Sequence, residues 1–171
     1  TISGGTVTGP AGGIYNQGTL TVTDSTISGN RATAGAGGIL NVGSLTVTNS
    51  TISGNSTTTG SGGGIYNSSS ATLAVANSTI SGNSAPTAGG GIYNNTSGTV
   101  TITNSTLSGN SASNGGGIFN SSGTSALTIA NSTFSNNSGS LGGSIQNRAT
   151  ASITNSAFSG NTATNRGGAI M

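Results

Sequence analysis

The 171-residue sequence predicts an all-β fold, a single-stranded parallel β-helix (β-solenoid) in which each coil lies on the one before. Three observations favour this fold. Apolar residues recur about every 26 residues, they alternate with Thr, Ser or Ala over short stretches, and asparagine recurs at three fixed places in each repeat. Such a repeat buries its apolar face against its neighbours. We expect roughly six to seven coils, stacked ~4.8 Å apart.

Each repeat contains three predicted strands. The first holds one sizeable apolar residue, from Ile2 in the first repeat to Phe158 in the last. The second holds the isoleucine of a GGIYN-like string, which returns every 25 to 27 residues from Ile14 to Ile170. The third alternates apolar residues with Thr, as in residues 19–23 (TLTVT), which is the period expected of a strand with one buried face. No 3.6-residue stripe appears, so helices are disfavoured.

Asparagine ends each of these strands and forms three columns along the chain. It tolerates the left-handed conformation of a sharp bend, and its amide can both donate and accept toward the same residue one coil away. We therefore expect three corners, each built on a structural ladder of stacked side chains. The first column is Asp24, Asn49, Asn77, Asn104, Asn131 and Asn155; the second is Asn30, Asn55, Asn83, Asn110, Asn137 and Asn161; the third is Asn16, Asn41, Asn67, Asn94, Asn120 and Asn147.

The spacing of the repeats separates paired segments from loops. Leu20, the first apolar residue of the third strand, and Asn30, in the second asparagine column, are ten residues apart. The same separation holds in all the other repeats. It varies from eight to ten residues between that asparagine and the next isoleucine, and from four to seven between the third asparagine column and the next strand. Constant length indicates backbone paired on both sides, and variable length indicates surface arches. The string NSTISGN, at residues 49–55 and 77–83, is therefore interpreted as scaffold.

The composition disfavours several classes of function. Four side chains carry a full charge, Asp24, Arg31, Arg148 and Arg166, so the basic stripe that holds nucleic acid is absent and no nucleic-acid partner is expected. No run approaches ~20 apolar residues, so we expect no membrane insertion of this segment. The chain has no His, Cys, Lys or Glu. Because glycosidases usually need two carboxylates and nucleophilic triads a histidine, we expect no catalytic residues, no metal or cofactor site and no enzyme activity.

Residues 158–170 read FSGNTATNRGGAI, and residues 134–137 (FSNN) repeat the first motif. These strings resemble the paired FxxN and GGAI motifs of the polymorphic outer membrane protein family, best known from chlamydiae, and the pectate-lyase-like repeats of large bacterial surface proteins. Other repeats depart from them, with Ile or Leu in place of Phe and GGGI in place of GGAI. The resemblance implies a right-handed β-helix and a secreted or surface-exposed passenger with adhesive or structural roles.

Two surface features suggest binding functions. The outward positions of the third strand carry a T-x-T grid that resembles the flat ice-binding faces of β-helical antifreeze proteins. Its threonines are Thr19, Thr21, Thr23, Thr46, Thr48, Thr99, Thr101 and Thr103. An aromatic column of Tyr15, Tyr66, Tyr93 and Phe119 could stack against sugars. Each has a simpler explanation, because Thr suits any outward strand position and aromatic residues pack between coils.

The chain begins with TISG and stops at GGAIM, both in the middle of a repeat. We expect residues 1–171 to form one solenoid domain, which is either a segment of a longer repeat array or a unit that stacks on copies of itself. The open strand edges at both ends favour pairing with further coils, and the low net charge removes repulsion between them. The expected function is that of a non-enzymatic, extracellular or cell-surface structural protein, an adhesin or a fibre-forming β-helix. The alternatives are an ice-binding module and a carbohydrate-binding passenger that contacts surface glycans.

Overall fold

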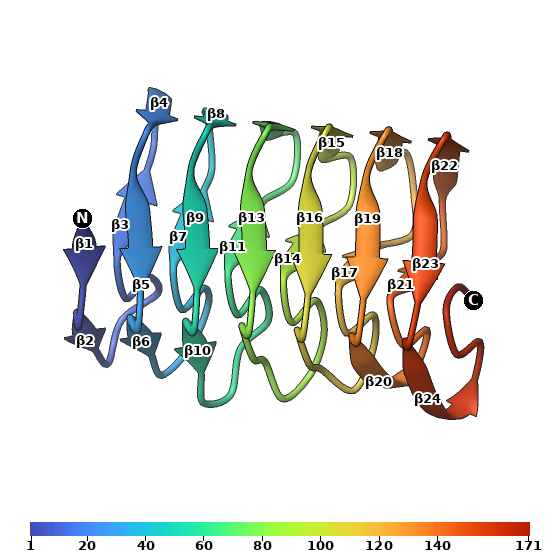
Figure 1. Ribbon diagram of the computed structural model, residues 1–171. Helices are drawn as coiled ribbons and strands as arrows, with labels where there is room; N and C mark the ends of the chain where they lie inside the picture. The colour runs from blue at the N-terminus through green and yellow to red at the C-terminus, as the bar shows by residue number, and fades with distance from the viewer.

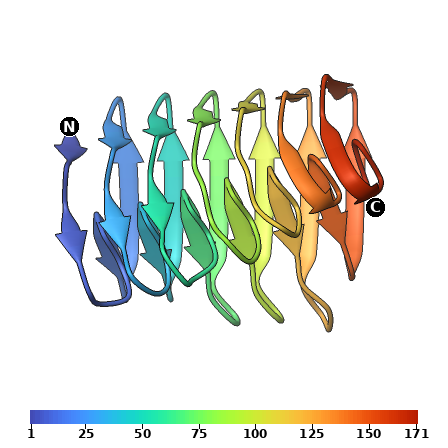
Figure 2. The ribbon, with the colours of Figure 1, turned by 90° about the horizontal axis from the view of Figure 1, so that it is seen from below.

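The computed structural model describes all 171 residues, which form 24 short strands and no helix. The strands follow one another around a coil, and successive coils lie side by side along a single axis, with the N-terminus at one end and the C-terminus at the other (Figures 1 and 2). All strand pairs are parallel. The sequence-based prediction of a parallel β-solenoid with coils of about 26 residues is therefore confirmed.

Four sheets run along the solenoid, and we number them in the order in which a coil visits them. Sheet 1 has seven strands and sheet 2 is short and interrupted. The strands of sheet 1 are β1 (Ile2–Ser3), β5 (Thr26–Ser28), β9 (Thr51–Ser53), β13 (Thr79–Ser81), β16 (Thr106–Ser108), β19 (Thr133–Ser135) and β23 (Ala157–Ser159). Those of sheet 2 are β2 (Thr6–Val7), β6 (Arg31–Ala32) and β10 (Ser56–Thr57), followed in later coils by β20 (Ser138–Leu141) and β24 (Thr162–Arg166).

Sheets 3 and 4 have six strands each. The strands of sheet 3 are β3 (Ile14–Asn16), β7 (Ile39–Asn41), β11 (Ile65–Asn67), β14 (Ile92–Asn94), β17 (Ile118–Asn120) and β21 (Ile145–Asn147). The strands of sheet 4 are β4 (Thr19–Thr23), β8 (Ser44–Thr48), β12 (Thr72–Ala76), β15 (Thr99–Thr103), β18 (Ala126–Ala130) and β22 (Thr150–Thr154). Sheets 1, 3 and 4 match the three strands expected in each repeat.

Sheet 2 was not expected from the sequence, which suggested only a surface arch between the second asparagine column and the next isoleucine. Its strands follow that asparagine directly, and single-residue bridges at Ser84 and Ser111 join its two halves. The pairing of β20 with β24 contains a register shift between Gly139 and Leu141. The variable length of this segment is therefore absorbed after the short strand, in the loop that leads to sheet 3.

The core is a narrow column of 19 buried apolar residues. Side chains stack on their equivalents because the register is conserved from coil to coil; Leu45 pairs with Leu73, for example, and Val47 with Val75. In β12 the outward residues are more exposed than the inward Leu73 and Val75 between them, as the period of two predicts. Each fully buried Ile or Leu contributes about 1.5–3 kcal/mol by burial. Stability therefore comes mainly from contacts between neighbouring coils.

Glycine lets the chain approach itself closely just before sheet 3. A Cβ atom on Gly90 would lie 2.4 Å from the carbonyl oxygen of Gly116 and 2.5 Å from that of Ser111, both on the next coil. Gly37 and Gly63 face the same obstruction from the coils that follow them. The glycine pairs in the GGIYN-like strings are thus required by packing between coils, a role that the sequence did not reveal.

Candidate functional site

The first asparagine column forms an exposed corner. All six residues adopt the left-handed backbone conformation, with φ between 46° and 51°. Their side chains are exposed and make no hydrogen bond to one another. The expectation of a side-chain ladder was therefore wrong for Asp24, Asn49, Asn77, Asn104, Asn131 and Asn155. A carboxylate at Asp24 fits this corner because an exposed side chain needs no partner inside the protein.

A serine ladder takes the place of the expected asparagine ladder at this corner. The serine that follows each first-column residue donates its backbone N–H to the Oγ of its equivalent on the next coil, at 3.0–3.1 Å. Each Oγ in turn donates to the carbonyl two residues earlier, at 2.7–2.8 Å. Sequence reasoning missed this ladder, although its signal was present: Ser25, Ser50, Ser78, Ser105, Ser132 and Ser156 recur without exception.

The second asparagine column is a continuous buried ladder. From the second member onward, each Oδ1 accepts two hydrogen bonds from the equivalent residue on the preceding coil, one from its backbone N–H at 2.9–3.0 Å and one from its Nδ2 at 3.0 Å. The Oδ1 of the first member, Asn30, accepts from the backbone N–H of Gly5 at 2.9 Å. Each Nδ2 also donates to a backbone carbonyl of sheet 1 in the preceding coil. The column comprises Asn30, Asn55, Asn83, Asn110, Asn137 and Asn161, and the first five are fully buried.

The third asparagine column is also a ladder, with a simpler pattern. Each Nδ2 except that of Asn147, the last member, donates to the Oδ1 of the equivalent asparagine on the next coil at 2.7–2.9 Å. Most also donate to carbonyls of the loop that leads into sheet 4, as Asn94 does to Gly98 at 2.9 Å. The column runs through Asn16, Asn41, Asn67, Asn94, Asn120 and Asn147. It ties the loop between sheets 3 and 4 to the stack and so fixes where sheet 4 begins.

The structure offers little chemistry for catalysis. No group of three or more His, Cys, Asp or Glu residues lies together, and Asp24, the one carboxylate side chain, is exposed at a corner. Ser144 carries the one buried side-chain polar atom without a hydrogen-bond partner. A nucleophilic serine needs a neighbouring base, and the chain has no histidine or lysine to supply one. No helix is long and apolar enough to cross a membrane.

The predicted threonine array lies on the outward side of sheet 4. Thr21, Thr46, Ala74, Thr101, Thr128 and Ser152 form its middle row, because each pairs with the next across the sheet. Thr19 and Thr99 belong to one flanking row, and Thr23, Thr48 and Thr103 belong to the other. All of these side chains are exposed or half-buried. The structure therefore brings the predicted threonines together on one face.

The aromatic column lies on sheet 3 and packs against itself. The rings of Tyr66 and Tyr93 are tilted with centroids 4.7 Å apart, and those of Tyr93 and Phe119 are stacked at 5.4 Å. The Arg148 guanidinium lies 5.3 Å from the centre of the Phe119 ring. Burial, and then the nearby Tyr93, raises the pKa of the Tyr66 hydroxyl above its ordinary value. Because neighbouring rings occupy the faces of Tyr93, this column is better suited to packing than to stacking with a sugar.

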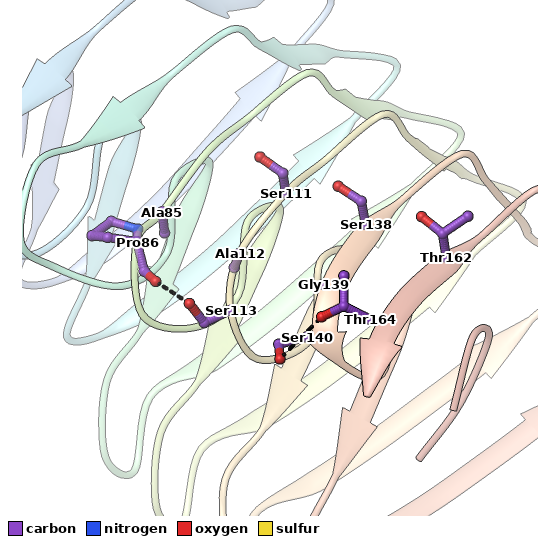
Figure 3. Close-up of a pocket in the computed structure, with 10 residues that line it drawn as sticks. All are labelled: Ala85, Pro86, Ser111, Ala112, Ser113, Ser138, Gly139, Ser140, Thr162 and Thr164. Atoms are coloured by element: carbon purple, nitrogen blue, oxygen red, sulfur yellow. Dashed lines mark hydrogen bonds between the residues drawn. The ribbon is translucent and has the colours of Figure 1, made fainter. Parts of the chain in front are cut away.

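A shallow polar groove of about 450 Å³ crosses the outward side of sheet 2 in the later coils (Figure 3). Two rows of hydroxyls line it on successive coils, Ser111, Ser138 and Thr162 in one and Ser113, Ser140 and Thr164 in the other. Some of these hydroxyls bond within the protein: Ser113 donates to the Pro86 carbonyl at 2.7 Å, and Thr164 donates to Ser140 at 3.3 Å. The groove carries no charged side chain.

Comparison with known proteins agrees with this geometry. Residues 1–134 match the family model described as the right-handed β-helix region, and residues 155–171 match the Chlamydia polymorphic membrane protein repeat. The resemblance drawn from the FxxN and GGAI motifs is thereby confirmed, and so is the right hand that it implied. No curated protein and no solved structure matches the chain.

Proposed function

The chain belongs to the right-handed β-helix family, and from this we propose that it is part of an extracellular or cell-surface passenger with a structural or adhesive role and no enzyme activity. The observation that carries the proposal is the continuous pair of asparagine ladders. They stabilise a rod whose interior is filled and whose exterior is uncharged over most of its length. Such a rod is suited to holding surfaces in place, not to performing reactions.

The residues on the outside of the solenoid support a location of the protein at the cell surface. Hydroxyl and amide side chains cover the coils, and full charges are confined to four residues. The match of residues 155–171 to a repeat of a polymorphic membrane protein agrees with a place at the cell surface. The fold alone does not determine the function, because β-helical proteins have many different functions. The choice of a non-enzymatic role therefore rests on the lack of neighbouring acids, bases and metal ligands.

The ligand of an adhesive passenger would have to suit a neutral surface rich in hydroxyls. Serine and threonine hydroxyls both donate and accept hydrogen bonds, as sugar hydroxyls do. The groove on sheet 2 offers such groups, whereas the aromatic column offers few free ring faces. If a glycan binds this protein, we therefore place it at the groove. Stacking of the rod end to end on copies of itself stays a prediction.

Labelling of intact cells tests the proposed location. Antibodies raised against residues 1–171 should stain unpermeabilised cells of the source organism as strongly as permeabilised ones, and brief protease treatment of intact cells should remove the signal. An antibody against a cytoplasmic protein of the same cells serves as the control and should stain only after permeabilisation. Staining that requires permeabilisation would contradict a surface location.

A further inference from the structure

The outward face of sheet 4 is a regular surface built from strands of five residues each. Its six strands pair without a register shift, and they lie along the top of Figure 1, where all but β12 are labelled. Three outward positions on each strand give 18 in all, of which twelve are Thr, two are Ser and four are Ala. With ~4.8 Å between strands and ~6.8 Å between outward residues, the face measures about 24 Å by 14 Å.

Most hydroxyls on this face have no partner inside the protein. Thr72 donates to the Ser44 Oγ at 3.1 Å, and Thr154 donates to the Ile129 carbonyl at 3.4 Å. The other ten threonine hydroxyls make no hydrogen bond within the chain, so they must bond to solvent or to a ligand. Threonine is β-branched, and its side chain is therefore stiff about χ1. The methyl and hydroxyl groups thus form a fixed two-dimensional grid.

The grid narrows the chemistry of a possible ligand. None of the four charged residues lies in sheet 4, so a charged ligand would gain nothing from this face. A single glycan chain repeats along one direction, whereas the hydroxyls repeat along two. The ligand that fits is neutral, flat, periodic in two directions and able to donate and accept hydrogen bonds at every repeat. The surface of ice has all four properties.

We propose that the outward face of sheet 4 binds ice through water molecules ordered on its threonines. The hydroxyls hold water in place, and the methyl groups fill the spaces between those waters. Little entropy is lost on binding because the grid is already rigid. Ala74, Ala76, Ala126 and Ala130 interrupt the grid but leave shallow gaps, which do not hold the face away from a flat crystal. Adhesion to ice is a function beyond that of a structural surface rod.

Sheet 1 carries a narrower array that the test must separate from sheet 4. Its outward positions form two rows, a Thr row that includes Thr106 and a Ser row that includes Ser108. Its strands have at most three residues, compared with five in sheet 4, so it offers two rows of contacts where sheet 4 offers three. We therefore assign ice binding to sheet 4.

The experiment measures inhibition of ice recrystallisation by residues 1–171 at micromolar concentration. The wild-type chain should inhibit. Thr101→Lys, at the centre of the sheet 4 face, should lower the activity at least about tenfold, because the long charged side chain separates several ordered waters from the crystal at once. Ser84→Lys, at an exposed position of sheet 2 that does not line the groove, should retain the activity of the wild type.

Two further variants test the role of the threonine hydroxyl and the choice of sheet 4 over sheet 1. Thr101→Val retains the shape and the strand propensity of Thr and removes only one hydroxyl, so it should fold and lower the activity less than Thr101→Lys does. Circular dichroism confirms folding of each variant. The proposal is overturned if the wild type does not slow recrystallisation, or if it binds crystalline polysaccharide while leaving ice unaffected. Loss of activity in Thr106→Lys, with full activity in Thr101→Lys, would overturn the assignment to sheet 4.

Discussion

Replacing Asn83 with Ala is expected to lower the free energy of unfolding by about 4 kcal/mol. The Asn83 Oδ1 accepts hydrogen bonds from the backbone N–H and the Nδ2 of Asn55, at 2.9 and 3.0 Å. Its Nδ2 donates to the Ile52 carbonyl and to the Asn110 Oδ1, both at 3.0 Å. The substitution removes all four bonds at a fully buried site and leaves the Asn55 N–H without an acceptor.

The matched control is Asn77, in the same coil but in the exposed first column. Asn77→Asp should change stability little, because Asp24 occupies the equivalent corner. Asn77→Ala should cost about 1 kcal/mol, the penalty for a left-handed backbone at a residue without a helpful side chain. Urea unfolding followed by circular dichroism measures all three variants. Equal losses for Asn83→Ala and Asn77→Ala would show that the buried ladder contributes no more than a corner.

Replacing Gly90 with Ala is expected to destabilise the protein by about 3 kcal/mol or more, or to prevent folding. The new Cβ would lie within 2.6 Å of the carbonyl carbon and oxygen of Ser111 and the carbonyl oxygen of Gly116. These are backbone atoms of the next coil, so they can move away only if the coils separate. Separation would also stretch the ladders and the core contacts of the neighbouring strands.

Gly18→Ala is the control for this prediction. Gly18 lies in the loop that precedes sheet 4, and an added Cβ would have no atom within 4 Å. Because Ala restricts the unfolded chain more than Gly does, this variant should be neutral or more stable by about 0.4–1 kcal/mol. Thermal unfolding compares the two. If both alanine variants unfold at the same temperature, contact between coils at Gly90 is not what requires glycine there.

The fold could be predicted from the sequence because a solenoid repeats its local rules in every coil. Ile52 and Ile80 occupy the same place in two repeats, and the structure pairs them directly. The alternation in residues 19–23 predicted which side chains face the core, and it also placed Thr21 and Thr23 outward. The second and third asparagine columns are ladders as expected, since a buried amide stacked on its equivalent can satisfy both its donor and its acceptor.

The features that sequence reasoning missed depend on distances between coils. Asn49 and Asn55 stand six residues apart in one repeat, yet one supplies a left-handed corner and the other a buried amide. Residue type alone could not separate these two roles, because asparagine suits both. The serine ladder, the close approach at Gly90 and the short sheet 2 follow from the path of the backbone between the strands. That path is set by tertiary packing, not by local pattern.

Hydrogen exchange of the asparagine side-chain amides, followed by nuclear magnetic resonance, tests most directly whether two buried ladders and one exposed corner column hold the solenoid together. The amides of the inner coils in the second and third columns, such as Asn83 and Asn94, should exchange at least about a thousandfold more slowly than those of Asn49, Asn77 and Asn104, because they open only when coils separate. Equally fast exchange in all three columns would contradict the ladders, and equally slow exchange would contradict the exposed corner.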